Sequence, residues 1–215
     1  MSWNLRECTA KWDGQPWSIG VDLASAPSQP LIQIYGGTKQ PVLDIALTPR
    51  EQHTPQATHG IPLGEAYVRQ KDLIAIFPES VPWRFGYQVD LRGVSLDLPD
   101  TLVLEIWLSV QTSLLDSHPQ LELQLRGEPF KLSVNDCWTS ESSRLGLLVH
   151  PLDRPDCQIE PSKDGLAMRV FGRFMEKGVI RRMRFQLIAN QETQPARYWQ
   201  ERFDEFSNSP LPLTT

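Results

Sequence analysis

Arginine is the residue type whose spacing most strongly suggests chemistry in this sequence. Arg169 and Arg173 precede a Lys177-Gly178 pair, and Arg182 and Arg184 follow it, in two runs that alternate apolar and polar residues. A two-residue turn at Lys177-Gly178 predicts a β-hairpin in which Arg173 lies directly opposite Arg182. Because like charges in that position destabilise a strand pair, a compensating group is expected.

Two kinds of group could compensate such an arginine-rich sheet face. One is an acidic side chain from an adjacent strand, for which Asp90, Glu105 and Glu122 are the candidates. The other is a small anionic ligand or the acidic surface of a partner protein, which guanidinium groups bind through paired hydrogen bonds. The second alternative predicts a binding surface made of Arg169, Arg173, Arg182, Arg184, Phe171 and Trp107.

Trp107 joins this set because it alternates out of phase with the apolar residues around it. It falls on the same side of its strand as Glu105 and Ser109. An aromatic ring on the polar face of a sheet can stack on a sugar or a base, or anchor another chain. Alternatively, Trp107 lies under a C-terminal helix and packs against Trp199 or Phe203.

Metal-binding and catalytic patterns are weak. His53 and His59 are six residues apart in a Pro-containing stretch, and the run from His150 to Cys157 also holds Asp153 and Asp156. Neither spacing presets ligands on one face of a helix or strand, so we predict no metal site and no cofactor. Phosphate-loop, dinucleotide and nucleophile-elbow motifs are missing from the sequence.

Catalysis by two carboxylates offers a further alternative. Glu105 and Glu122 fall on the polar faces of strands that could be neighbours, as in a glycosidase. Solvated surface acids are the simpler interpretation.

Charge and hydropathy exclude some partners. The 215-residue chain has a net charge of −5, which provides no general attraction to nucleic acid. Apolar runs such as 102–108 are interrupted by charges, so no membrane segment is expected. Glu7 and Lys11 lie where a secretory signal would need an apolar core, so we expect a soluble cytoplasmic protein. The three cysteines, Cys8, Cys137 and Cys157, are expected to be free thiols.

The elements that would position these residues are mainly β-strands. Residues 17–23, 83–91, 102–110, 121–125 and 130–134 alternate apolar and polar side chains, which is typical of strands with one buried face. Shorter apolar runs at 31–35, 42–47, 66–69, 73–77 and 145–149 are further strand candidates. An Asp13-Gly14 pair predicts another hairpin turn. The pattern favours an all-β fold, an antiparallel two-sheet sandwich or flattened jelly-roll-like barrel.

A single helix is predicted at 195–206, where Trp199, Phe203 and Phe206 share one face. Residues 1–206 are expected to form one β domain that includes this helix, followed by a flexible tail over 207–215. The stretch 48–64 is predicted to be a long loop.

These observations favour a non-catalytic binding or assembly module that uses the arginine-rich face. The alternative is a hydrolase that acts on a carbohydrate or on an anionic substrate with His and Asp residues from its loops.

Overall fold

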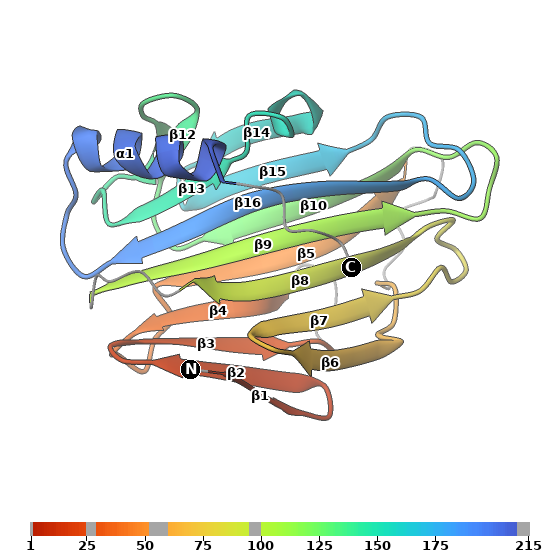
Figure 1. Cartoon of the computed structure of the whole chain (residues 1–215), viewed down its shortest axis with the longest axis horizontal. Helices are drawn as coiled ribbons and strands as arrows, with labels where there is room; N and C mark the ends of the chain where they lie inside the picture. Colours follow the sequence, from red (N-terminus) through yellow and green to blue (C-terminus); the bar gives the residue numbers. More distant parts are fainter. Residues whose placement is uncertain (1, 25–28, 52–59, 95–99, 210–215) are drawn as a thin grey trace.

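The computed structural model describes residues 2–24, 29–51, 60–94 and 100–209, and shows two antiparallel sheets of eight strands each (Figure 1). The first sheet has the order β1 (Trp3–Arg6), β2 (Thr9–Gly14), β3 (Trp17–Asp22), β4 (Pro30–Gly36), β5 (Leu43–Glu51), β10 (Pro119–Arg126), β15 (Gly165–Phe171) and β14 (Cys157–Ser162). The second has the order β11 (Phe130–Leu132), β12 (Cys137–Ser140), β13 (Leu145–Val149), β16 (Ile180–Asn190), β9 (Thr101–Gln111), β8 (Gly86–Val94), β7 (Asp72–Phe77) and β6 (Glu65–Arg69). The predicted two-sheet all-β fold is therefore confirmed.

The sheets face each other because each strand presents alternate apolar residues to a shared core. In β10, for example, Leu121, Leu123 and Leu125 are buried inward, whereas Gln120 and Gln124 lie on the outer face. Inward side chains of both sheets belong to one continuous apolar cluster. Edge strands also lie beside each other, β1 with β6 and β11 with β14, which gives the sandwich the character of a flattened barrel.

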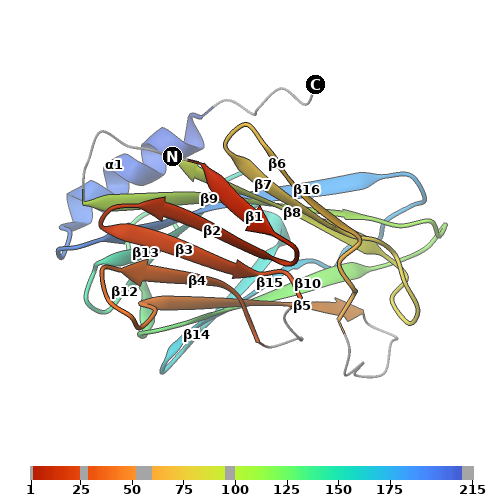
Figure 2. The same ribbon diagram turned by 90° about the horizontal axis from the view of Figure 1, so that it is seen from below.

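The helix α1 (Ala196–Ser207) covers the outer face of the second sheet, on the side away from the first sheet (Figure 2). Its buried residues Trp199 and Phe206 pack on Val103, Cys137, Leu148 and Ile188 from β9, β12, β13 and β16. The predicted helix is confirmed, with Pro195 as the residue before its first turn. Among the described residues, no helix is long and apolar enough to cross a membrane.

The predicted hairpin at Lys177-Gly178 is wrong. β15 pairs with β10 and β14 in the first sheet, whereas β16 pairs with β9 and β13 in the second sheet. The connection thus crosses from one sheet to the other. Two strands that contribute to one core from opposite sheets show the same alternation of apolar and polar residues as two strands of a hairpin. The alternation identifies which face of a strand is buried, but it does not identify the neighbouring strand.

Other predictions needed smaller corrections. The hairpin near Asp13-Gly14 exists, but Gly14 pairs with Trp17, so the turn residues are Gln15 and Pro16. This register places Trp12 opposite Ile19 and buries both in the core. The predicted loop 48–64 begins later than expected, because β5 continues to Glu51. His53 and His59 lie outside the described residues, as do residues 210–215 of the predicted tail.

Candidate functional site

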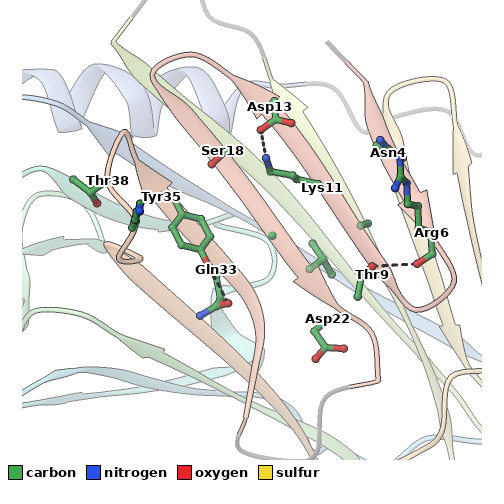
Figure 3. A pocket seen from close by; sticks show the side chains of 14 residues that line it. Asn4, Arg6, Thr9, Lys11, Asp13, Ser18, Asp22, Gln33, Tyr35 and Thr38 are labelled. Atoms are coloured by element: carbon green, nitrogen blue, oxygen red, sulfur yellow. Dashed lines mark hydrogen bonds and ion pairs between the residues drawn. The ribbon is translucent and has the colours of Figure 1, made fainter.

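A groove of about 820 Å³ lies on the outer face of the first sheet, over β1 to β4 (Figure 3). Polar side chains at alternate strand positions make most of its lining. The lining residues are Asn4, Arg6, Thr9, Ala10, Lys11, Asp13, Ser18, Gly20, Val21, Asp22, Gln33, Tyr35, Thr38 and Lys39. Small-molecule sites are usually concave and mostly apolar with a few convergent polar groups, so this groove is more polar than most.

Tyr35 and Gly20 shape the centre of the groove. A methyl group at Gly20 would come within 3.6 Å of the Tyr35 ring, so the ring lies close to the backbone of β3. The Tyr35 hydroxyl donates to Oε1 of Gln33 at 3.0 Å, and Nε2 of Gln33 donates to Oδ1 of Asp44 at 2.9 Å. These bonds fix the half-buried ring and orient the amide beside it.

Charges of both signs surround the ring. Lys11 and Asp13 form an exposed ion pair with Nζ to Oδ1 at 3.0 Å. Oδ1 of Asp22 accepts a hydrogen bond from the backbone N–H of Ala24 at 3.0 Å. Because basic and acidic side chains alternate in the lining, the groove offers many hydrogen-bonding groups without a strong field of one sign.

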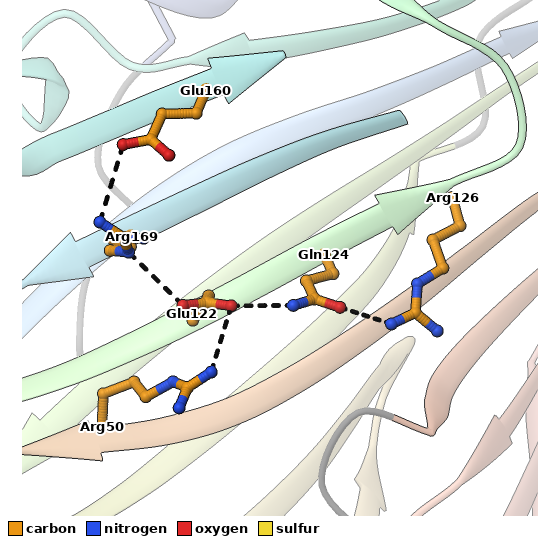
Figure 4. Close-up of polar contacts among 6 residues, drawn as sticks. All are labelled: Arg50, Glu122, Gln124, Arg126, Glu160 and Arg169. Carbon is orange, nitrogen blue, oxygen red and sulfur yellow. Dashed lines mark hydrogen bonds and ion pairs between the residues drawn. The ribbon is translucent and has the colours of Figure 1, made fainter. Parts of the chain in front are cut away.

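A polar network continues across the same outer face on β5, β10, β15 and β14 (Figure 4). Glu122 is its centre and lies 3.5 Å from Arg50 and 3.4 Å from Arg169, measured between carboxylate oxygen and guanidinium nitrogen. Nε2 of Gln124 donates to Glu122 at 2.8 Å, and Arg126 donates to Oε1 of Gln124 at 2.5 Å. Arg169 also reaches Glu160 at 3.6 Å.

The network controls the ionisation of Glu122. Burial alone would raise the pKa of this carboxyl, but the charge of Arg50 and the hydrogen bonds from Gln124, Arg169 and Arg50 outweigh it, so the pKa lies below its usual range. Glu122 is one of the three acids expected as counter-charges for the opposed Arg173 and Arg182, but in the structure it pairs with Arg50 and Arg169 instead.

The structure does not gather the four predicted arginines on one face. Arg169 lies on the outer face of the first sheet, and Arg173 follows β15 in a loop, where it forms an ion pair with Asp156. Arg182 and Arg184 lie in the second sheet, opposite Ser109 and Trp107 of β9. Arg173 and Arg182 therefore do not oppose each other, and the repulsion that suggested an anion site does not exist.

The other predicted residues are similarly dispersed. Phe171 is buried in the core with a positive φ of 68°, next to Gly172. Arg182 is exposed and lies near Asp90. Burial raises the pKa of the Asp90 carboxyl, and the charge of Arg182 offsets part of this increase.

Arg184 and Trp107 connect the second sheet to α1. The Arg184 guanidinium lies 5.6 Å from the Trp107 ring centre and 5.4 Å from that of Phe206, and the residue is only 2% exposed. Its Nη1 donates to Oγ of Ser209 at 3.1 Å. Trp107 Nε1–H donates to Glu105 at 2.6 Å. Trp107 thus lies near the helix, as one of the two interpretations expected, but the helix residue in this contact is Phe206, reached through Arg184, and not the expected Trp199 or Phe203.

His150 and Asp153 lie beneath the end of the same helix. The His150 ring meets Phe206 edge-on at 5.4 Å, and its Nδ1 accepts the backbone N–H of Leu152 at 3.3 Å. Burial, with the nearby charge of Arg184, lowers the pKa of His150. Asp153 accepts the backbone N–H of Arg184 at 3.0 Å, and burial raises the pKa of its carboxyl. In the part of the chain that the structure describes, no three His, Cys, Asp or Glu side chains group as metal ligands.

The predicted carboxylate pair is wrong. Glu105 lies on the outer face of the second sheet beside Gln186, and Glu122 lies on the outer face of the first sheet. The core of the sandwich separates them, so they cannot act on one glycosidic bond.

The groove was missed in the sequence because its residues occupy the polar positions of four separate strands, which look like an ordinary solvated face. Gly20 was the one available signal, since a glycine inside a strand often marks a close approach of another group.

Comparison with known proteins adds little. No family model and no curated protein matches this chain. One solved structure, a provisionally assigned kojibiose phosphorylase from human microbiome, is similar over 94% of this chain and 30% of its own, with a TM-score of 0.47 and 10% sequence identity. The chain thus spans less than a third of that protein, and the likeness assigns no activity.

Proposed function

We propose that this chain is a non-catalytic binding module whose groove over β1 to β4 takes a polyhydroxylated ligand of the carbohydrate class. The observation that carries the proposal is the Tyr35 ring, held against Gly20 and flanked by the amide of Gln33. A sugar presents an apolar C–H face and a rim of hydroxyls. An aromatic ring supplies the apolar contact, and the surrounding polar side chains supply hydrogen bonds.

The distribution of charge supports this ligand class over an anion. Arg169 and Arg173 are engaged by carboxylates, and Arg184 is buried beneath α1. The groove itself combines three basic side chains with two acidic ones. An anion or an acidic partner at the predicted arginines is therefore the weaker alternative.

Hydrolysis within the groove is also less well supported. Asp13 lies opposite Ser18, and Asp22 lies opposite Thr9, so the two acids are four strand positions apart. At about 3.3 Å per residue this corresponds to about 13 Å, which is beyond the separation of glycosidase carboxylates. The groove is thus better suited to holding a sugar than to cleaving one.

Affinity electrophoresis in gels containing soluble neutral polysaccharides tests the proposal. The wild-type protein should be retarded by at least one of them, and Tyr35→Ala should weaken binding about tenfold, as expected for loss of one aromatic contact of about 1.4 kcal/mol. Gly20→Val should act similarly, because a larger side chain would displace the ring.

Tyr67→Ala provides the matched control, since Tyr67 is a half-buried tyrosine on β6 of the other sheet. The proposal would be wrong if no polysaccharide retards the wild type, or if Tyr35→Ala binds as well as Tyr67→Ala. Release of reducing ends from a retarding polysaccharide would favour the hydrolase instead.

A further inference from the structure

Three loops meet at one end of the sandwich, beyond the strands labelled β7, β9 and β15 (Figure 1). They connect β7 to β8, β9 to β10 and β15 to β16. Five apolar side chains on these loops and the adjoining start of β16 are 42% to 98% exposed. We call them the apolar loop tips: Val81, Leu115, Phe174, Val179 and Ile180.

Hydrogen bonds between the loops hold this end together. Ser113 donates its backbone N–H and its hydroxyl to the Glu79 carboxylate at 3.0 and 2.8 Å. The backbones of Ser117 and Met175 exchange two bonds at 3.2 and 2.9 Å, and Gly178 N–H donates to the Thr112 carbonyl at 3.3 Å. The tips therefore project from a connected surface.

The chemistry of the tips argues against a protein partner. Four of the five are aliphatic, whereas the energetically dominant residues of protein interfaces are enriched in Trp, Tyr and Arg and poor in Leu and Val. The Phe174 ring meets His118 edge-on at 6.0 Å, and the four aliphatic side chains are exposed around it. Exposed aliphatic side chains can enter a fluid apolar phase, which needs no complementary shape.

The charge at this end differs from that of the whole chain. Segments 78–84, 112–118 and 172–182 hold five basic and three acidic side chains, and Asp156 outside them pairs with Arg173, so this end has a net charge of +1, although the chain as a whole has −5. Arg84, Lys177 and Arg182 are exposed within these segments. Basic groups beside apolar tips are complementary to the surface of an anionic bilayer.

We propose that the apolar loop tips insert into the interfacial layer of a membrane that contains anionic lipids, with the neighbouring basic residues at the level of the headgroups. We expected no association with a membrane because the sequence has no membrane-spanning segment. The insertion of loop side chains into the interfacial layer does not require such a segment. Such an attachment would hold the groove of the first sheet near material at the membrane surface.

Sedimentation with lipid vesicles tests the inference directly. The full chain should pellet with phosphatidylcholine vesicles that contain phosphatidylserine, and much less with phosphatidylcholine alone. The double variant Phe174→Ser/Ile180→Ser should lower the bound fraction at least tenfold. Lys177→Gln/Arg182→Gln should reduce the preference for anionic vesicles, and high salt should do the same.

Leu132→Ser is the matched control, because Leu132 on β11 is 55% exposed and Ile180 is 54% exposed. Far-UV circular dichroism and urea unfolding should confirm that each variant is folded. The inference is overturned if wild type binds neither vesicle, or if the tip variant and Leu132→Ser bind equally. It is also overturned if sedimentation velocity shows self-association that only the tip variant abolishes, since the tips would then join copies of the chain.

Discussion

Glu122 shows how charge is balanced on the outer face of the first sheet. Its carboxylate is 10% exposed and accepts from Gln124, while Arg50 and Arg169 approach from the strands on either side. The two arginines are about 40% exposed, so water screens part of their interaction with the acid. The acid nonetheless accepts hydrogen bonds from three side chains on three strands.

Replacement of this acid tests the network. Glu122→Gln should lower the free energy of unfolding at neutral pH by about 1 to 2 kcal/mol, because two arginines lose their counter-charge. Since folding lowers the pKa of Glu122, its stabilisation is present above about pH 4.3 and is lost as pH falls through the folded pKa. Urea unfolding at neutral and acidic pH should therefore show a smaller acid-induced decline in the variant. An equal decline would show that the network does not depend on this charge.

Gly178 provides a test of backbone conformation at one residue. Its φ is +79°, and Val179 N–H donates to the Glu176 carbonyl at 3.2 Å, as in a turn that needs positive φ at its third residue. Gly178→Val should cost about 1 to 3 kcal/mol in thermal or urea unfolding. Gly178→Asn should cost less, because asparagine tolerates this region. Equal stability of the valine variant and the wild type would contradict the turn geometry.

His150 predicts a dependence on pH near neutrality. Folding lowers its pKa, so the neutral ring is favoured and stability is complete above the unfolded pKa of about 6.5. Stability should fall as pH decreases from there, because the unfolded chain binds a proton that the folded chain resists. Asp153, whose pKa is raised, opposes this trend only at lower pH. Urea unfolding at pH 7.5 and 5.5 should show a smaller change for His150→Asn than for wild type; identical changes would exclude His150 as the cause.

At the scale of elements, α1 depends on a glycine in the strand beneath it. A Cβ at Gly146 of β13 would overlap the ring of Trp199, the most deeply buried residue of the helix. The helix begins without a side-chain cap and has no basic residue in its last turn. Packing on the second sheet is therefore the main source of its stability.

Gly146→Val should displace α1 from the sheet. We expect a loss of about 1 to 3 kcal/mol from overpacking, together with a reduced helical signal in far-UV circular dichroism. Limited proteolysis should cut the variant within 196–207 faster than it cuts the wild type. Unchanged cleavage in this segment would show that the sheet accommodates the larger residue.

Strands and the helix were predictable from the sequence where their buried residues recur at the spacing typical of a strand or a helix. The alternation in residues 102–110 and 121–125 identified β9 and β10, and the spacing of Trp199, Phe203 and Phe206 identified α1. The partners of the strands were not predictable in this way. β10 pairs with β5 and β15, which are distant in the chain, and alternation contains no information about such long-range choices.

The candidate site was less accessible to prediction than the elements. The arginine-rich face depended on pairing β15 with β16, and separating these strands into two sheets dispersed Arg173 and Arg182. The groove, in contrast, exists only because β1 to β4 are neighbours in the folded chain. A site that is assembled from several strands becomes visible when strand order is known.

The continuous core has a consequence for the molecule as a whole. Strands from both ends of the sequence contribute to it, from Trp3 of β1 to Leu187 of β16, so neither sheet can bury its inner face alone. We therefore expect urea unfolding to be one cooperative transition. The far-UV circular dichroism spectrum of the folded protein should be β-dominated. The urea concentration at the midpoint of unfolding should be the same whether it is followed by circular dichroism or by tryptophan fluorescence. Separate midpoints would show that the sheets are independent cooperative units. In Gly146→Val the sheet transition should remain single, since α1 packs on the outer face of the second sheet, apart from this core.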